Sequence, residues 1–164
     1  MKYFEHESAA TFDEAVSLLK ESPKGKTVVM AGGSDLIGVL KEQILEDYPE
    51  KVVDLKTVRG GEYIKQDGDT IEIGALTKLC DIVKSDLLNE KAPVLSQAAR
   101  SVATPLIRNV ATMGGNICQD VRCWFYRYPH GIGGRMDCMR KGGKECYAVM
   151  GDNRYHSIFG GMKV

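Results

Sequence analysis

The sequence predicts a mixed α+β protein with two lobes, followed by a segment with little regular structure. Residues 1–56 alternate helix and strand signals around a glycine turn, and residues 57–121 combine a hairpin signal with helices. Residues 122–164 lose hydrophobic periodicity and are dominated by Cys, aromatic residues, Arg and Gly. A length of 164 residues fits one large domain or two small lobes.

The first lobe begins with a helix and continues as a small α/β unit. Thr11 and Glu14 form a capping box, and the apolar residues after it have helical spacing. Residues 27–30 are a short β-branched strand that runs into a glycine turn at 31–35, after which apolar residues predict a short helix. Residues 51–55 are the next strand, so helix and strand alternate through this lobe.

The second lobe begins with a hairpin and continues with helices. Two alternating segments, 63–66 and 70–73, flank the Asp-Gly-Asp sequence at 67–69, which is typical of a hairpin turn. Helical spacing of apolar residues is present over 76–88 and again from Pro93. The Cys80 thiol lies on the apolar side of the first of these segments, so we interpret it as a core residue.

Composition excludes several classes of protein. Lys and Arg total 22, and Asp and Glu also total 22, so the chain lacks the basic excess of nucleic-acid-binding proteins. A hydrophobic share of 43% argues against intrinsic disorder. No stretch reaches the ~18 apolar residues of a membrane span, and the N-terminus lacks the apolar core of a signal peptide. We therefore expect a cytoplasmic protein without nucleic-acid or membrane partners.

Each lobe contains a glycine turn suited to backbone contact with a ligand. The first, AGGSD at 31–35, joins a strand to a helix and so brings backbone N–H groups and a helix N-terminus to one point, which favours phosphate binding. Taken alone it fits an ordinary strand–helix connection better, because it is neither GxGxxG nor a Walker motif. The second, TMGGN at 112–116, adds another glycine pair. Together the two turns favour a dinucleotide held by its pyrophosphate.

Four sequence blocks up to about residue 121 carry a family resemblance. They are VVMAGGSDLIGVLKE, VDLKTVRGGEYI, IEIGALTKLCDI and PVLSQAARSVATPLIRNVATMGGNICQD. In this order they resemble the FAD-binding medium subunit of molybdenum hydroxylases, the family of xanthine dehydrogenase and carbon monoxide dehydrogenase. The resemblance implies the two-lobed α+β fold of vanillyl-alcohol-oxidase-type flavoproteins, with FAD between the lobes.

The resemblance also implies a set of FAD-binding residues on the two turns. These are Ala31, Gly32, Gly33, Ser34, Asp35, Thr112, Gly114, Gly115 and Asn116. Medium subunits of the family continue well beyond residue 164, so we expect the fold to be incomplete at its C-terminus. The chain is then a fragment or a split subunit.

Cysteines concentrate in the last segment. Cys123, Cys138 and Cys146 stand in a polar, glycine-rich stretch with many Lys and Arg residues. Metal ligation would supply folding energy that this stretch cannot obtain from apolar burial, and neighbouring cations favour thiolates. Zinc and an iron–sulfur cluster both fit cysteine ligands, although the CxxC pairs of zinc ribbons are absent. Three thiols without a metal are the alternative.

The sequences CWFYR and DCMRKGGKEC around these cysteines resemble the cluster-bearing insertion in the flavin subunit of 4-hydroxybenzoyl-CoA reductase. The resemblance implies a four-iron, four-sulfur cluster with Cys123, Cys138 and Cys146 as three ligands. The fourth ligand lies beyond Val164, which we prefer, or is Cys118.

The family resemblance implies an electron-transfer flavoprotein subunit. Substrate is oxidised at a molybdenum site on another chain, and electrons pass through two-iron clusters to FAD and an external acceptor. We therefore expect a molybdopterin-binding large subunit and a small 2Fe-2S subunit as partners, and no catalytic residue in this chain. The alternatives are a non-redox zinc-binding module with degenerate glycine turns, and a stand-alone FAD oxidase, for which 164 residues leave no room.

Overall fold

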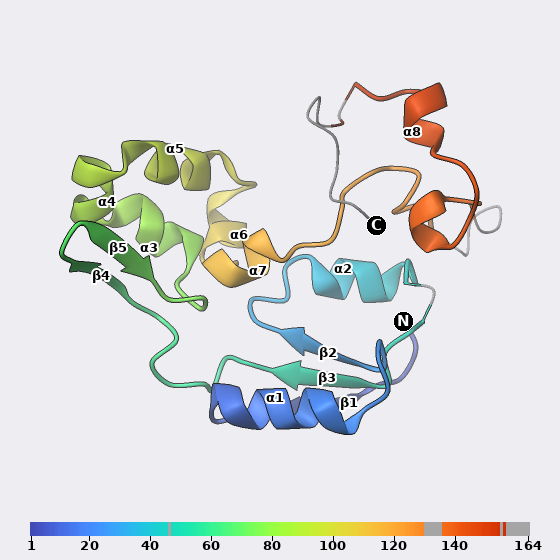
Figure 1. The fold of residues 1–164 in the computed structure, drawn as a ribbon, viewed down its shortest axis with the longest axis horizontal. Helices are drawn as coiled ribbons and strands as arrows, with labels where there is room; N and C mark the ends of the chain where they lie inside the picture. Colours follow the sequence, from blue (N-terminus) through green and yellow to red (C-terminus); the bar gives the residue numbers. More distant parts are fainter. Residues whose placement is uncertain (46, 130–135, 155, 157–164) are drawn as a thin grey trace. The chain divides into compact units, whose positions relative to one another are not determined.

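The computed structural model describes residues 1–45, 47–129, 136–154 and 156, and the chain divides into two units (Figure 1). The large unit consists of Tyr3–Leu36 and Pro49–Gln119. The small unit consists of Met1–Lys2, Ile37–Tyr48 and Asp120–Val164. Within the described ranges, none of the helices has both the length and the hydrophobicity that crossing a bilayer requires. The predicted division of the chain at residues 56 and 121 stays a prediction.

A three-stranded parallel sheet is the base of the large unit, in the order β1-β3-β2. Its strands are β1 (Glu5–Ser8), β2 (Thr27–Met30) and β3 (Lys51–Asp54). The register pairs Met30 with Asp54 and Ser8 with Asp54, so the carboxyl ends of all three strands lie at one edge. This shared edge positions the loops after β2 and β3.

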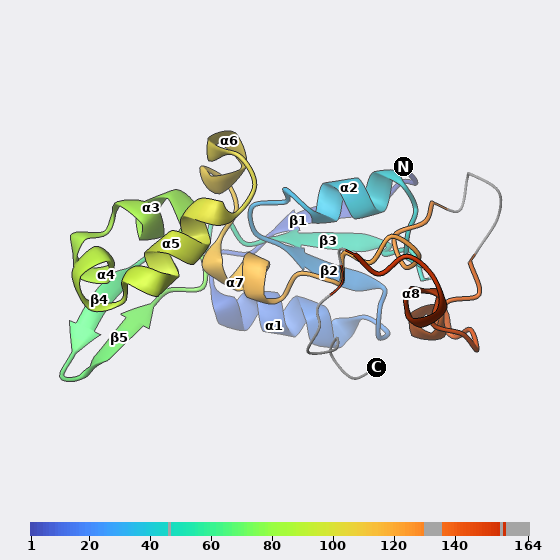
Figure 2. The same cartoon turned by 90° about the horizontal axis from the view of Figure 1, so that it is seen from above.

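Helix α1 (Phe12–Glu21) connects β1 to β2 and runs beside the sheet (Figures 1 and 2). The predicted N-cap forms, because the Thr11 hydroxyl accepts the Glu14 N–H at 3.1 Å. The Glu14 carboxylate reaches back one residue further than in a standard capping box and accepts the Ala10 N–H at 2.7 Å. Ala15 is the buried residue of the helix. It belongs to a small core made of Ala9, Ala15, Val53, Val58 and Leu76.

A hairpin and five short helices complete the large unit. β4 (Ile64–Asp67) and β5 (Thr70–Ile73) pair antiparallel around a turn in which Gly68 has a φ of 56°. The helices are α3 (Leu79–Lys84), α4 (Asp86–Lys91), α5 (Pro93–Ser101), α6 (Pro105–Arg108) and α7 (Met113–Ile117). A second core, of Leu79, Ile82, Leu88, Ala99 and Ala111, joins them.

The structure differs from the sequence prediction at two points in this region. The single helix expected over 76–88 is two helices, because Ser85 adopts an extended conformation and its hydroxyl caps α4 by accepting the Leu88 N–H at 3.3 Å. Cys80 was expected in the core but is partly exposed, with its thiol 3.5 Å from the Asp81 carboxylate. The buried face of α3 is formed by Leu79 and Ile82 instead.

The small unit contains α2 (Leu36–Lys41), which begins at the last residue of the preceding large-unit segment, a 3-10 turn η1 (Met139–Lys141), and α8 (Tyr147–Met150). Polar contacts order the cysteine segment. The Arg127 guanidinium donates to the carbonyl oxygens of Asp120 and Val121, at 2.8 and 2.7 Å. The Tyr126 hydroxyl donates to the Asp120 carboxylate, and burial together with this bond raises the Tyr126 pKa. Short elements alone were expected here, and the described residues agree.

Candidate functional site

The first glycine turn lies at the carboxyl-end edge of the sheet. Ala31 and Gly32 come directly after β2, while Leu55 and Lys56 come directly after its neighbour β3. A hydrogen bond joins the ends of β2 and β3, because the Leu55 N–H donates to the Met30 carbonyl at 2.9 Å. Figure 1 shows both arrowheads pointing toward the side where α7 lies. Ligands of open α/β sheets bind outside the carboxyl ends of the strands, so this edge is the favoured place for a site.

The chain immediately before the second glycine turn meets the first turn at this edge. A Cβ on Gly32 would overlap the Val110 carbonyl oxygen and lie 3.0 Å from the Ala111 Cα, so only glycine fits there. Gly33 has a φ of 70°, which favours glycine for a different reason. Within the described residues, the amides of Gly32, Gly33 and Ser34 donate no hydrogen bond to another group of the chain. These amides can therefore be offered to an anion.

The second glycine turn uses its amides within the protein. Thr112 is the N-cap of α7, and its hydroxyl accepts the Gly115 N–H at 3.2 Å. The Gly114 N–H donates to the Ala75 carbonyl at 2.8 Å, and the Asn116 N–H donates to the Thr112 carbonyl at 2.9 Å. A Cβ on Gly114 would lie 2.9 Å from the same Ala75 oxygen. This glycine pair is thus explained by packing, and its predicted contact with a ligand stays a prediction.

A cavity of about 290 Å³ lies where these segments meet in the large unit. Its size suits part of a dinucleotide, since pockets for small molecules begin at roughly 300 Å³. The lining residues come from both glycine turns and from the loops beside them: Ala31, Gly32, Lys56, Glu62, Leu76, Lys78, Asn109, Val110 and Thr112. Of the nine predicted FAD-binding residues, Ala31, Gly32 and Thr112 line this cavity directly.

The charged groups of the cavity were not predicted from the sequence. The Lys56 ammonium lies 3.6 Å from the Asp54 carboxylate, and the Lys78 ammonium lies 3.8 Å from the Glu62 carboxylate. Neither lysine belongs to a glycine motif, and a single lysine in a loop is too common to indicate a binding role. A signal for Lys56 does exist, because it comes two residues after a strand that is parallel to the one ending in the glycine turn.

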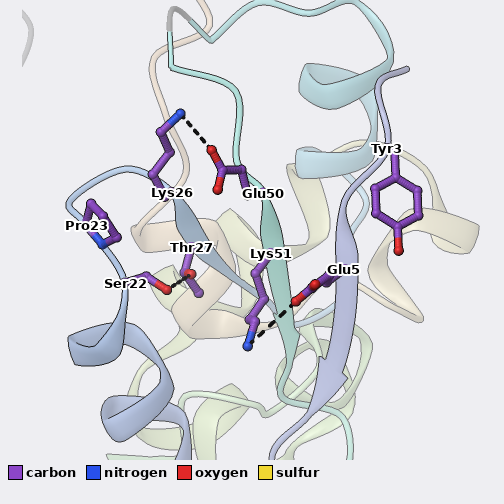
Figure 3. Close-up of a pocket in the computed structure, with 8 residues that line it drawn as sticks. All are labelled: Tyr3, Glu5, Ser22, Pro23, Lys26, Thr27, Glu50 and Lys51. Atoms are coloured by element: carbon purple, nitrogen blue, oxygen red, sulfur yellow. Dashed lines mark hydrogen bonds and ion pairs between the residues drawn. The ribbon is translucent and has the colours of Figure 1, made fainter.

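A second cavity, of about 370 Å³, lies at the amino ends of the strands (Figure 3). Most of its charged and hydroxyl side chains bind one another: Lys26 pairs with Glu50 at 3.1 Å, and the Ser22 and Thr27 hydroxyls are 2.7 Å apart. Lys51 lies 3.9 Å from Glu5 and 2.7 Å from Glu7 on the neighbouring strand. Because these groups satisfy each other and neither of the two predicted ligand-binding glycine turns lies at this edge, we interpret the cavity as structural.

The cysteines predicted to bind a cluster are not assembled as ligands. Within the described part of the chain, no group of three or more His, Cys, Asp and Glu side chains is placed to hold a metal ion. Cys138 is buried, Cys123 is partly buried and Cys146 is exposed. The backbones of Cys138 and Glu145 form a bridge, which brings the segments around Cys138 and Cys146 side by side. Cys118 is exposed and belongs to the large unit. This arrangement does not fit a four-iron cluster.

The glycine turns, the parallel sheet edge and the cavity together define a candidate nucleotide-binding site in an α+β domain. The model of the family described as "FAD binding domain in molybdopterin dehydrogenase" matches residues 2–123, and the chain belongs to this family. The family resemblance and the flavoprotein class predicted from the sequence are thereby confirmed. The zinc-module alternative finds no support, because the matched family is a flavin-binding one.

Individual relatives agree with this family. The nicotinate dehydrogenase FAD-subunit of Eubacterium barkeri is 34% identical over 117 residues, covering 71% of this chain and 39% of that subunit. The aldehyde oxidoreductase FAD-binding subunit PaoB of Escherichia coli (strain K12) is 29% identical over 161 residues, covering 98% of this chain and 48% of the relative. The carbon monoxide dehydrogenase structure from Hydrogenophaga pseudoflava matches with a TM-score of 0.66 at 31% identity, over 71% of this chain and 39% of that one. The chain thus spans less than half the length of these relatives, and the predicted fold class is confirmed.

Proposed function

We propose that this chain is the FAD-binding part of an electron-transfer subunit in a molybdenum-dependent oxidoreductase. The observation that carries the proposal is the contact of Gly32 with Val110, which sets the first glycine turn beside the segment leading into the second, on one cavity. FAD, when bound, supplies the redox chemistry that side chains lack. The task of the chain is then to hold the cofactor and orient it.

The binding residues are those of the two turns. Residues 31–34 present backbone N–H groups to the FAD diphosphate, and Asp35 caps the next helix or accepts a bond from a ligand hydroxyl. Thr112, Gly114, Gly115 and Asn116 approach from the other side. The amides of Gly114, Gly115 and Asn116 have acceptors within the chain, so contact with the cofactor falls to the side chains of Thr112 and Asn116 or requires an exchange of hydrogen-bond partners.

Substrate oxidation belongs to another chain in this proposal. The matched relatives are named as FAD-subunits and FAD-binding subunits of dehydrogenases and oxidoreductases, which implies further subunits. The partners we propose are a molybdopterin-binding large subunit and a small 2Fe-2S subunit. This chain would pass electrons between their clusters and an external acceptor or donor.

We also propose that the last segment binds a four-iron, four-sulfur cluster in the complete protein. Cys123, Cys138 and Cys146 would be three ligands, with Cys118 or a residue of a longer chain as the fourth. The match to PaoB extends over this segment, which supports a common role for it. Binding would require the cysteines to move from their present arrangement, because they do not form a ligand group as they stand.

The experiment that tests FAD binding is a titration of the full chain with FAD, monitored by flavin fluorescence and by the visible spectrum after gel filtration. Retention of one FAD per chain, displaced by ADP, is expected. ADP shares the diphosphate and adenosine with FAD but not the flavin. Absence of any retained flavin would contradict the proposal.

A further inference from the structure

We infer that Lys56 and Lys78 are the countercharges for the FAD diphosphate, and that each exchanges a carboxylate partner for phosphate when FAD binds. This inference rests on the proposed function and extends it to two residues outside the glycine turns. Both side chains line the cavity that contains Ala31, Gly32 and Thr112. They arrive there from two different loops, so they approach a ligand in the cavity from different directions.

The position of Lys56 is fixed by the parallel sheet. It comes two residues after β3, at the edge where the first glycine turn comes after β2. The Lys56 N–H donates to Asp54 Oδ1 at 3.0 Å, which fixes the backbone, while the side chain is 57% exposed and can turn into the cavity. Asp54 keeps other partners if the ammonium leaves, because His6 Nε2 lies 3.6 Å from its carboxylate and the Lys56 amide remains bound.

The position of Lys78 is fixed by the second turn. Its backbone forms a bridge with Thr112, the N-cap of α7, and the flanking Leu79 N–H donates to the Ala111 carbonyl at 2.9 Å. The side chain therefore starts directly opposite the entrance to the second glycine turn. Its ion pair with Glu62 is loose, at 3.8 Å, with 41% of the lysine and 57% of the glutamate side chain exposed.

A phosphate oxygen is a stronger partner for these lysines than the carboxylates they now contact. An exposed ion pair such as Lys78–Glu62 contributes little to stability, because water screens both charges. A lysine that binds a phosphate oxygen gains a charge-assisted hydrogen bond, and the Gly32–Ser34 amides add further donors at the same site. Lys78 can therefore leave Glu62 for a diphosphate. The Asp54 carboxylate is buried, and Lys56 can leave it because the Lys56 N–H and His6 remain beside that carboxylate. A neutral ligand offers no charged acceptor, so the lysines would keep their carboxylate partners.

The test measures FAD affinity of Lys56→Gln and Lys78→Gln in the full chain by flavin fluorescence, at low and at physiological salt. Each variant should bind FAD about tenfold more weakly, since one charge-assisted bond is lost. The salt dependence should also become shallower. Arginine variants at the same positions should retain affinity within about threefold, and Glu62→Gln, which frees Lys78, should bind FAD more tightly.

Lys65→Gln is the matched control. Lys65 belongs to the same unit, forms an ion pair with Glu72 at 2.8 Å and is 59% exposed, but it does not line the cavity. It should leave FAD affinity unchanged. ADP should lose affinity for the two cavity variants in parallel with FAD. If both cavity variants bind FAD and ADP as Lys65→Gln does, the inference is overturned while the proposed function stands. If the unmodified chain binds no FAD, both are overturned.

Discussion

Gly32 packs against the carbonyl oxygen of Val110 so closely that a Cβ at position 32 would overlap it. This contact joins the turn after β2 to the loop between α6 and α7, which lie almost 80 residues apart in the sequence. The site therefore depends on a backbone-to-backbone approach that no side chain can replace.

Gly32→Ala should destabilise the large unit by about 1–3 kcal/mol, because the added methyl group forces the Val110 backbone to move. Urea unfolding monitored by circular dichroism measures the change. Gly38→Ala is the control, since nothing lies within 4 Å of a Cβ at that helical position, and alanine there should stabilise the chain by about 0.5–1 kcal/mol. Equal stability of Gly32→Ala and Gly38→Ala would show that a methyl group at position 32 fits beside the Val110 carbonyl without displacing it.

Gly33→Ala and Gly60→Ala separate backbone strain from ligand binding. Both glycines have a positive φ, 70° and 76°, so both variants should lose a similar amount of stability, about 1 kcal/mol. Only Gly33 belongs to the turn that offers its amides to the diphosphate. FAD titration should therefore show weaker binding for Gly33→Ala alone. If Gly60→Ala loses FAD affinity to the same extent, the weaker binding results from the general loss of stability and not from the turn at Gly33.

Local sequence signals were sufficient to predict α1, the strands β2 and β3 and the β4–β5 hairpin, because capping residues, β-branched runs and turn residues act over a few positions. β1 was not predicted. Its sequence, Glu5–Ser8, is polar, and it becomes a strand because β3 pairs with it and Lys51 bonds Glu7. The break at Ser85 was also missed, since the apolar spacing continues across it.

The candidate site likewise contains residues that local sequence predicts and residues that only the fold brings together. The glycine turns are local motifs and could be predicted, whereas Lys56 and Lys78 become neighbours of those turns only through the parallel register and the bridge between Lys78 and Thr112. Order in the cysteine segment was attributed to a metal. The described contacts show another source of order, since Lys141 is buried and lies 5.4 Å from the centre of the Tyr126 ring.

The Lys51–Glu7 pair predicts a pH dependence of stability at alkaline pH. The hydrogen bond to Glu7, opposed by partial burial, raises the Lys51 pKa above its ordinary value of 10.5. The folded state therefore holds this proton more tightly than the unfolded state, and the resulting stability is present below pH 10.5 and is lost as pH rises through the raised pKa.

Glu7→Gln should lower the thermal unfolding midpoint at pH 8, and the difference from the unmodified chain should shrink as the pH rises above 10.5. Glu72→Gln offers a comparison, because the Lys65 pKa is raised in the same way by Glu72 on the exposed hairpin, away from the sheet edge. A difference that stays constant with pH would mean that Glu7 stabilises the strand pair by packing and not by its charge.

The last prediction concerns the cysteines. Anaerobic reconstitution with iron and sulfide should give iron and acid-labile sulfide in a chain extended beyond Val164, and Cys123→Ser, Cys138→Ser and Cys146→Ser should each lose most of both. Cys80→Ser is the matched control, because Cys80 is a partly exposed thiol on α3 of the large unit and has no proposed ligand role. Cys118→Ser in the extended chain decides the fourth ligand: loss of iron assigns it to Cys118, and retention assigns it to a residue beyond Val164.

Thiol labelling distinguishes the metal-free arrangement of the cysteines from a cluster-bound one. As the structure has them, exposed Cys118 and Cys146 should react with a maleimide quickly, and buried Cys138 slowly. A cluster would protect Cys123, Cys138 and Cys146 together, because all three thiolates would bind iron. If reconstitution leaves the labelling order of the metal-free chain unchanged and no sulfide is bound, the segment is ordered by contacts such as those of Arg127 and Lys141, and the cluster proposal is wrong.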